Sequence, residues 1–161
     1  MIAAVIPDGD LLELLRAQSG LSIDADGRFL HRGEPITHAR TLEVLWRSLE
    51  RAPDGRYRVH VGRESAYVQI ADAPYVVRGV LEDPGGARSL LLSDGSREPL
   101  DPTTLALGRD GVLRCAVKGG HAARFGRGAQ VTLGLALEES PPGSGCFSLT
   151  IGGIRHPIAD R

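Results

Sequence analysis

Apolar residues recur mostly at every second position of the chain, which predicts strands, but one stretch has the spacing of a buried helix. In the segment 42–49 they recur at i, i+3, i+4 and i+7. These residues are Leu42, Leu45, Trp46 and Leu49. Thr37 precedes the stripe as the expected N-cap, and Gly55 follows it in a turn. We therefore expect an amphipathic helix that packs onto a sheet.

A tight hairpin is predicted directly before this helix. Residues 23–36 run through Asp26-Gly27, a dipeptide that suits the turn of a two-stranded ribbon, and they stop at Pro35. Further upstream, residues 11–18 have the pattern of a short amphipathic helix that follows Asp10 as a cap.

Alternation of apolar and polar residues predicts an antiparallel meander after the helix. Its expected strands cover residues 57–61, 66–70, 75–81 and 89–92. The Trp46 helix is expected to lie across one face of this sheet. The segment 94–104 contains two prolines and four charged residues, so we interpret it as the linker between two lobes.

The second half begins with Asp110-Gly111 and an alternating strand at 113–117. Residues 121–138 fit a helical face and a strand equally well, and three glycines within them disfavour a helix. We predict a helix there because the first half has one at the same place. A loop at 140–145 and a hairpin of 147–151 with 154–158 complete the chain.

The same order of Asp-Gly, strand, glycine, helix and strand pair is expected in both halves. The sequence therefore predicts an α+β fold of two small lobes that arose by duplication, each an antiparallel sheet with one packed helix. We place the N-terminal lobe at residues 1–100 and the C-terminal lobe at residues 101–161.

Composition and charge limit the classes of partner and the cellular location that we expect. The 161 residues carry 19 Lys+Arg and 20 Asp+Glu, a net charge of −1, which argues against a nucleic-acid or anionic-membrane binder. The apolar start, residues 2–6, is too short for a signal peptide, so we expect a cytoplasmic protein. Cys115 and Cys146 form no CxxC pair, and we expect reduced thiols, with Cys115 facing a core.

Catalytic and metal-binding motifs are lacking in the sequence. The histidines have no metal-ligand spacing, and Ser144 lies outside a GxSxG elbow. We expect no cofactor and a protein that is not an enzyme, unless residues distant in sequence assemble a site.

Two groups of residues are candidates for binding an anion. One surrounds the start of the Trp46 helix, and the other is a predicted helix N-terminus after Gly119, which would suit a phosphate. The candidate ligand-binding residues are His31, Arg32, His38, Arg40, Asp72, Tyr75, Gly120 and Arg124. The plainer alternatives are a solvated basic patch, a core position for Tyr75, and glycines that merely turn the chain.

Four segments resemble an uncharacterised bacterial family known only as a domain of unknown function. They are residues 26–36, 70–75, 123–125 and 147–158. The chain departs from that family at Leu30 and His38, where an aromatic and a basic residue are frequent. The resemblance implies a duplicated core, a C-terminal lobe similar to a pleckstrin-homology domain, a nucleotide-like ligand between the lobes and a signalling role.

Our first hypothesis is therefore a non-catalytic module that binds a small anionic, nucleotide-like ligand between its lobes. The alternative is a protein–protein interaction domain that uses sheet edges or the leucine-rich segment 11–18. An enzyme with a site assembled from distant residues is the third hypothesis.

Overall fold

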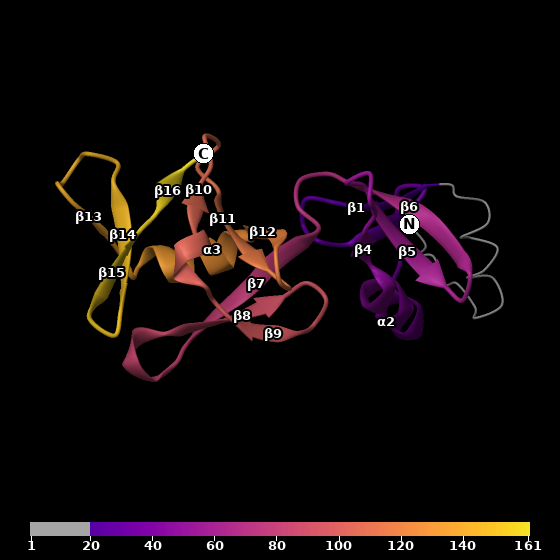
Figure 1. The fold of residues 1–161 in the computed structure, drawn as a ribbon, viewed down its shortest axis with the longest axis horizontal. Coiled ribbons are helices and arrows are strands. Elements are labelled where there is room, and N and C mark those ends of the chain that lie inside the picture. The colour runs from indigo at the N-terminus through magenta and orange to yellow at the C-terminus, as the bar shows by residue number, and fades with distance from the viewer. Residues whose placement is uncertain (1–19) are drawn as a thin grey trace. The chain divides into compact units, whose positions relative to one another are not determined.

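The computed structural model describes residues 20–161, and Figure 1 shows their α+β fold. The chain divides into two compact units between Pro74 and Tyr75. Within residues 20–161, each unit combines antiparallel hairpins with one α-helix. The helix predicted at 11–18 lies outside the described residues.

The first unit is a six-stranded sheet with helix α2. Its elements are β1 (Leu21–Ile23), β2 (Phe29–His31), β3 (Glu34–Pro35), α2 (Ala39–Ser48), β4 (Glu50–Arg51), β5 (Tyr57–Val61) and β6 (Glu64–Ile70). The strand order is β3-β2-β1-β6-β5-β4. Neighbouring strands are antiparallel except β1 and β6, which are parallel.

The predicted hairpin around Asp26-Gly27 is confirmed. The carboxylate of Asp24 accepts hydrogen bonds from the backbone N–H groups of Asp26 and Arg28, at 3.0 and 2.9 Å. Gly27 has φ 79°, a left-handed conformation that glycine adopts without strain. Local side-chain and backbone chemistry thus fixes the register of β1 against β2.

Helix α2 buries the predicted stripe but begins one residue later than expected. His38, rather than Thr37, is the N-cap, and its Nδ1 accepts from the Thr41 N–H at 3.3 Å. Leu45 is fully buried, and the Trp46 ring meets Phe29 edge-on with 4.6 Å between centroids. Both side chains anchor the helix to the apolar face of the sheet.

The second unit contains two sheets and helix α3. Its elements are β7 (Tyr75–Glu82), η1 (Pro84–Gly86), β8 (Arg88–Leu92), β9 (Arg97–Pro99), η2 (Pro102–Thr104), β10 (Ala106–Leu107), β11 (Leu113–Val117), β12 (His121–Phe125), α3 (Arg127–Gly134), β13 (Leu137–Glu139), β14 (Phe147–Ile151), β15 (Ile154–Pro157) and β16 (Ala159–Asp160). The strand orders are β16-β10-β11-β12-β7-β8-β9 and β13-β14-β15.

The single meander predicted for 57–92 is wrong. The hairpins β5–β6 and β7–β8 form as expected, but they belong to different sheets. The reason is a parallel pairing between β7 and β12, in which Tyr75 lies opposite Ala123 and Val77 opposite Phe125. This pairing places β7 within the second unit.

The segment 94–104, predicted to be a linker, instead lies inside the second unit. Asp94 closes a tight turn by accepting the Ser96 N–H at 2.9 Å, and β9 then pairs with β8. Asp101 caps η2 through the Thr103 N–H. We expected a lobe boundary at residue 100, whereas the chain divides into its two compact units after Pro74, because β7 pairs with the later strand β12 and joins β8 and β9 to the same sheet.

The helix predicted for 121–138 is also wrong over much of its length. Residues 121–125 form β12, which buries Ala123 and Phe125 on one face by alternation. The helix covers only Arg127–Gly134, with Gly126 as its N-cap. The alternation of residues 121–125 is compatible with a strand. The glycines limit the length of the helix, since each glycine lowers the stability of a helix by about 1 kcal/mol relative to alanine.

The two units share an order of elements and a register. Ile23 pairs with Phe29 across one Asp-Gly turn, and Leu107 pairs with Leu113 across the other. In the first unit the last strand, β6, lies parallel to the first, β1, and in the second unit the last strand, β16, lies parallel to β10. The duplication and the pleckstrin-homology-like lobe stay predictions.

Within residues 20–161, no helix is long and apolar enough to cross a membrane.

The burial of Cys115 generates a test of the second unit. Burial raises the pKa of its thiol to about 12, and the Glu98 and Asp101 carboxylates add to the effect. Cys146 is exposed. Because the thiolate is the reactive form, we expect an aromatic disulfide reagent at pH 8 to label Cys146 quickly and Cys115 only after unfolding. A Cys146→Ser variant should lose the fast phase, and a fast reaction that persists there would contradict the burial.

Candidate functional site

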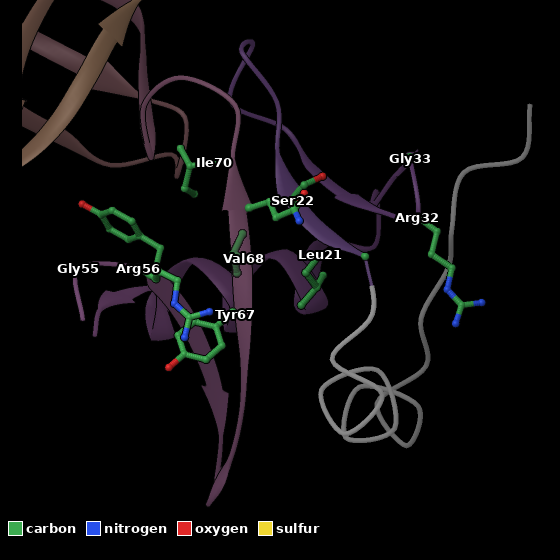
Figure 2. Close-up of a pocket in the computed structure, with 12 residues that line it drawn as sticks. Leu21, Ser22, Arg32, Gly33, Gly55, Arg56, Tyr67, Val68 and Ile70 are labelled. Atoms are coloured by element: carbon green, nitrogen blue, oxygen red, sulfur yellow. The ribbon is translucent and has the colours of Figure 1, made fainter. Parts of the chain in front are cut away.

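The first unit has a cavity of about 830 Å³ (Figure 2). Its twelve lining residues are 20–22, 32–33, 55–57 and 67–70. They come from β1, from the turn after β2, from the start of β5 and from β6. Among them are two arginines, Arg32 and Arg56, and no carboxylate. The Asp54 carboxylate, which lies outside the lining, pairs with the Arg56 Nη2 at 2.8 Å.

Arg56 and Tyr67 form a stacked pair at this cavity. The guanidinium carbon of Arg56 lies 3.7 Å from the centroid of the Tyr67 ring, and Figure 2 shows the group over the ring. Tyr67 is 38% exposed, so part of this surface is open to solvent. A cation over an aromatic face is attracted by the quadrupole of the ring.

Asp54 holds this pair in place from outside the lining. Its Oδ2 accepts from the Arg56 Nε at 2.9 Å and from the Tyr67 hydroxyl at 3.2 Å. Its Oδ1 accepts from the Arg56 backbone N–H at 2.9 Å. That backbone bond, followed by the guanidinium bond, holds the pKa of Asp54 below its ordinary value. The three residues thus link the turn before β5 to β6.

Arg32, the second arginine of the lining, is positioned by backbone contacts. It follows β2 with φ 51°, and its backbone N–H donates to the Gly20 carbonyl at 2.8 Å. A Cβ atom on Gly20 would lie 2.8 Å from the Arg32 Cγ, so glycine is required for this close approach. The Arg32 guanidinium points away from Tyr67 (Figure 2).

The other first-unit candidates lie outside this lining. His31 is half-buried at the end of β2, and Arg40 is exposed in the first turn of α2. His38 is the helix cap. Asp72 is exposed in the segment after β6. Of the five candidates in this unit, the structure brings Arg32 to the cavity.

The predicted helix N-terminus at Gly120 does not exist. Gly120 has φ 136° in the turn between β11 and β12, and Arg124 lies within β12, opposite Arg114. The prediction of an anion site there depended on the N–H groups of a helix N-terminus, and residues 121–125 form a strand instead. Tyr75 is buried at 5% exposure, and its ring centroid lies 6.0 Å from that of His121.

Sequence reasoning missed Arg56, Tyr67 and Gln69. The signal for two of them was present, since alternation along β6 buries Ala66 and Val68 and turns Tyr67 and Gln69 outward. An aromatic side chain on the polar face of a predicted strand is a reason to look for a binding surface. Arg56 had no comparable signal.

Other polar clusters in the described chain have structural explanations. Glu50 Oε1 contacts the Arg58 Nε at 2.6 Å and the His60 Nε2 at 2.7 Å, and these bonds hold the pKa of Glu50 below its ordinary value. The cluster joins the pairing strands β4 and β5. From residue 20 onward, the structure shows no group of three His, Cys, Asp or Glu side chains able to hold a metal ion.

Comparisons with known proteins identify the fold. No family model and no curated protein matches the sequence. A DUF1285 family protein from Silicibacter pomeroyi DSS-3 is similar with a TM-score of 0.69 and 19% identity, over 88% of this chain and 80% of that one. A second, from Shewanella baltica OS155, gives 0.59 and 20%, over 71% and 90%.

The chain has the fold of DUF1285 proteins. The acronym denotes a domain of unknown function, so the expected likeness to an uncharacterised family is confirmed at the level of fold. At this identity the similarity extends to no ligand and no reaction.

The Asp54–Arg56–Tyr67 arrangement predicts how the pKa of Asp54 changes when Arg56 or Tyr67 is replaced. The carboxylate form accepts these bonds, so they stabilise the fold at neutral pH and are lost as the pH falls through the lowered pKa of Asp54. Arg56→Gln should raise the pKa of Asp54, and Tyr67→Phe should raise it less, because the Tyr67 hydroxyl contributes less than Arg56. A carbon-detected NMR titration of the Asp54 carboxyl group measures each value. An ordinary pKa in the unmodified protein would contradict this geometry.

Proposed function

We propose that this protein is a non-catalytic module that binds a small anionic, nucleotide-like ligand in the cavity of its first unit. The observation that carries the proposal is the lining itself, which contains two arginines, two tyrosines and no carboxylate. A volume of about 830 Å³ falls in the usual range for small-molecule sites.

Each part of the lining suits a different part of such a ligand. The flat Arg56–Tyr67 stack offers a surface for a planar base, since guanidinium and aromatic planes both stack on bases. Gln69 and Ser22 offer an amide and a hydroxyl for hydrogen bonds to a base or a sugar. Arg32 supplies a guanidinium that suits phosphate geometry.

From the sequence we expected the ligand between the two lobes, whereas the proposed site lies within the first unit. Arg32 is retained from the candidate residues, and Arg56 and Tyr67 replace the second-lobe group of Gly120 and Arg124. A cytoplasmic signalling role belongs to the same proposal and is motivated by the resemblance to the bacterial family. No reaction is assigned.

A panel of nucleotides, inorganic phosphate and small carboxylates tests this function by thermal shift. A ligand at one hundred times its dissociation constant stabilises the folded state by about 2.7 kcal/mol. We expect nucleotides to raise the unfolding temperature by roughly a few degrees in a chain of this size. This rise in unfolding temperature should become smaller as the salt concentration increases, since the lining arginines are partly solvated and salt screens their charges.

Two variants and one control locate the ligand. Arg56→Gln and Arg32→Gln should each weaken nucleotide binding about tenfold or more, because the first removes the guanidinium plane that stacks on the base and the second removes a charge-assisted contact to phosphate. Arg63→Gln is the matched control, since Arg63 is exposed in the turn between β5 and β6 and lies outside the lining. Equal affinities in all three variants, or no shift at millimolar nucleotide, would overturn the proposal.

A second candidate function is protein–protein interaction through the second unit. Val131 is 62% exposed on α3, Leu135 is 86% exposed directly after this helix, and Ile154 is 63% exposed on β15. Large apolar side chains this exposed favour a partner surface where they are contiguous. Two results together would favour this function. No nucleotide would raise the unfolding temperature, and the protein would self-associate in a way that Leu135→Gln abolishes.

A further inference from the structure

Helices α2 and α3 occupy equivalent places in the two units. In α2 the buried residues are Thr41 and Leu45, and in α3 they are Ala129 and Leu133, with the same spacing of four. The residue after the second buried position is Trp46 in α2 and Gly134 in α3. The shared register therefore places an indole in one unit where the other has no side chain.

In the first unit the indole fills the space between the helix and the sheet. The Trp46 ring packs edge-on against Phe29, at 4.6 Å and an interplanar angle of 70°. Leu42 and Leu49, on the same side of the helix, pack against the same core. This part of the first unit is closed by its own side chains.

In the second unit the equivalent space is a cavity of about 350 Å³. Gly134 lines it, and a Cβ atom there would meet nothing within 4 Å. Leu113, the counterpart of Phe29 in the hairpin register, and Leu137 and Phe147 form apolar walls. The missing indole and the smaller Leu113 together account for the opening.

Gln130 is the polar residue of this lining, and its amide is directed at the backbone. Its Oε1 accepts from the Leu113 N–H at 2.9 Å, and its Nε2 donates to the Gly111 carbonyl at 2.8 Å. The hydrogen-bonding capacity of the side chain is thus largely used within the protein. The walls presented to a ligand are mainly the apolar groups of its neighbours.

We propose that this cavity binds a small planar aromatic molecule of about the size of indole. The shape of the ligand follows from the first unit, where an indole occupies the equivalent position. Apolar cavities of about 150 Å³ in proteins bind benzene, so a larger opening with similar walls suits a two-ring molecule. The inference is independent of the anion site, because every residue it uses lies in the second unit.

Indole itself is the probe for this site. We expect saturable binding at high micromolar to millimolar indole, followed by methyl NMR shifts of Leu113, Leu137 and Ile158, all of which line the cavity. Cyclohexylmethanol is the non-planar comparison and should bind at least fivefold more weakly. Equal affinity for the two probes, or no shift at the solubility limit of indole, would overturn the proposal.

Filling the cavity from within is the matched mutational test. Gly134→Trp should reduce indole affinity more than tenfold and raise the unfolding temperature, because the new side chain takes the place of the ligand. Gly128→Trp is the control, since Gly128 lies in the same helix, has open space around it and lies outside the lining. Gly134→Leu, with its fold checked by circular dichroism, is the second variant. Unchanged indole affinity in a folded Gly134 variant would exclude this cavity.

Discussion

A parallel strand pair between segments far apart in sequence is the interaction on which each unit depends. In the first unit Ser22 lies opposite Gln69, and the Ala71 N–H donates to the Ile23 carbonyl at 3.0 Å. In the second unit β10 and β16 pair in the same way. Hairpins and helices form from neighbouring residues, but this contact closes the chain on itself. It also places the start of β1 beside the end of β6, and these two strands form two walls of the first-unit cavity.

Elements governed by neighbouring residues were predictable from the sequence. The Asp26-Gly27 hairpin, the buried stripe of α2 and the two-glycine turn between β14 and β15 formed as expected. The parallel pairs could not be predicted, because each involves only two or three residues from segments far apart in sequence, and alternation within a strand does not specify its partner strand. The error at 121–125 has a different origin, since alternation and helical spacing coincided and the duplicated order was given more weight than the glycines.

The candidate site was predictable only in part. Arg32 was found because basic residues gather before α2, but Arg56 and Tyr67 are eleven positions apart and meet through the β5–β6 pairing. The prediction at Gly120 depended on a helix that begins there, and residues 121–125 form a strand instead. A site predicted from a charged residue near a turn is thus only as reliable as the predicted helix or strand that follows the turn.

Trp46 is the sole tryptophan of the chain, and it lies in the core of the first unit. Its fluorescence therefore monitors that unit alone, while circular dichroism records both. Melting curves from the two signals would coincide if the units unfold together and separate if each unfolds by itself. Because the one tryptophan lies in the first unit, the cooperativity between the two units can be measured without any added label.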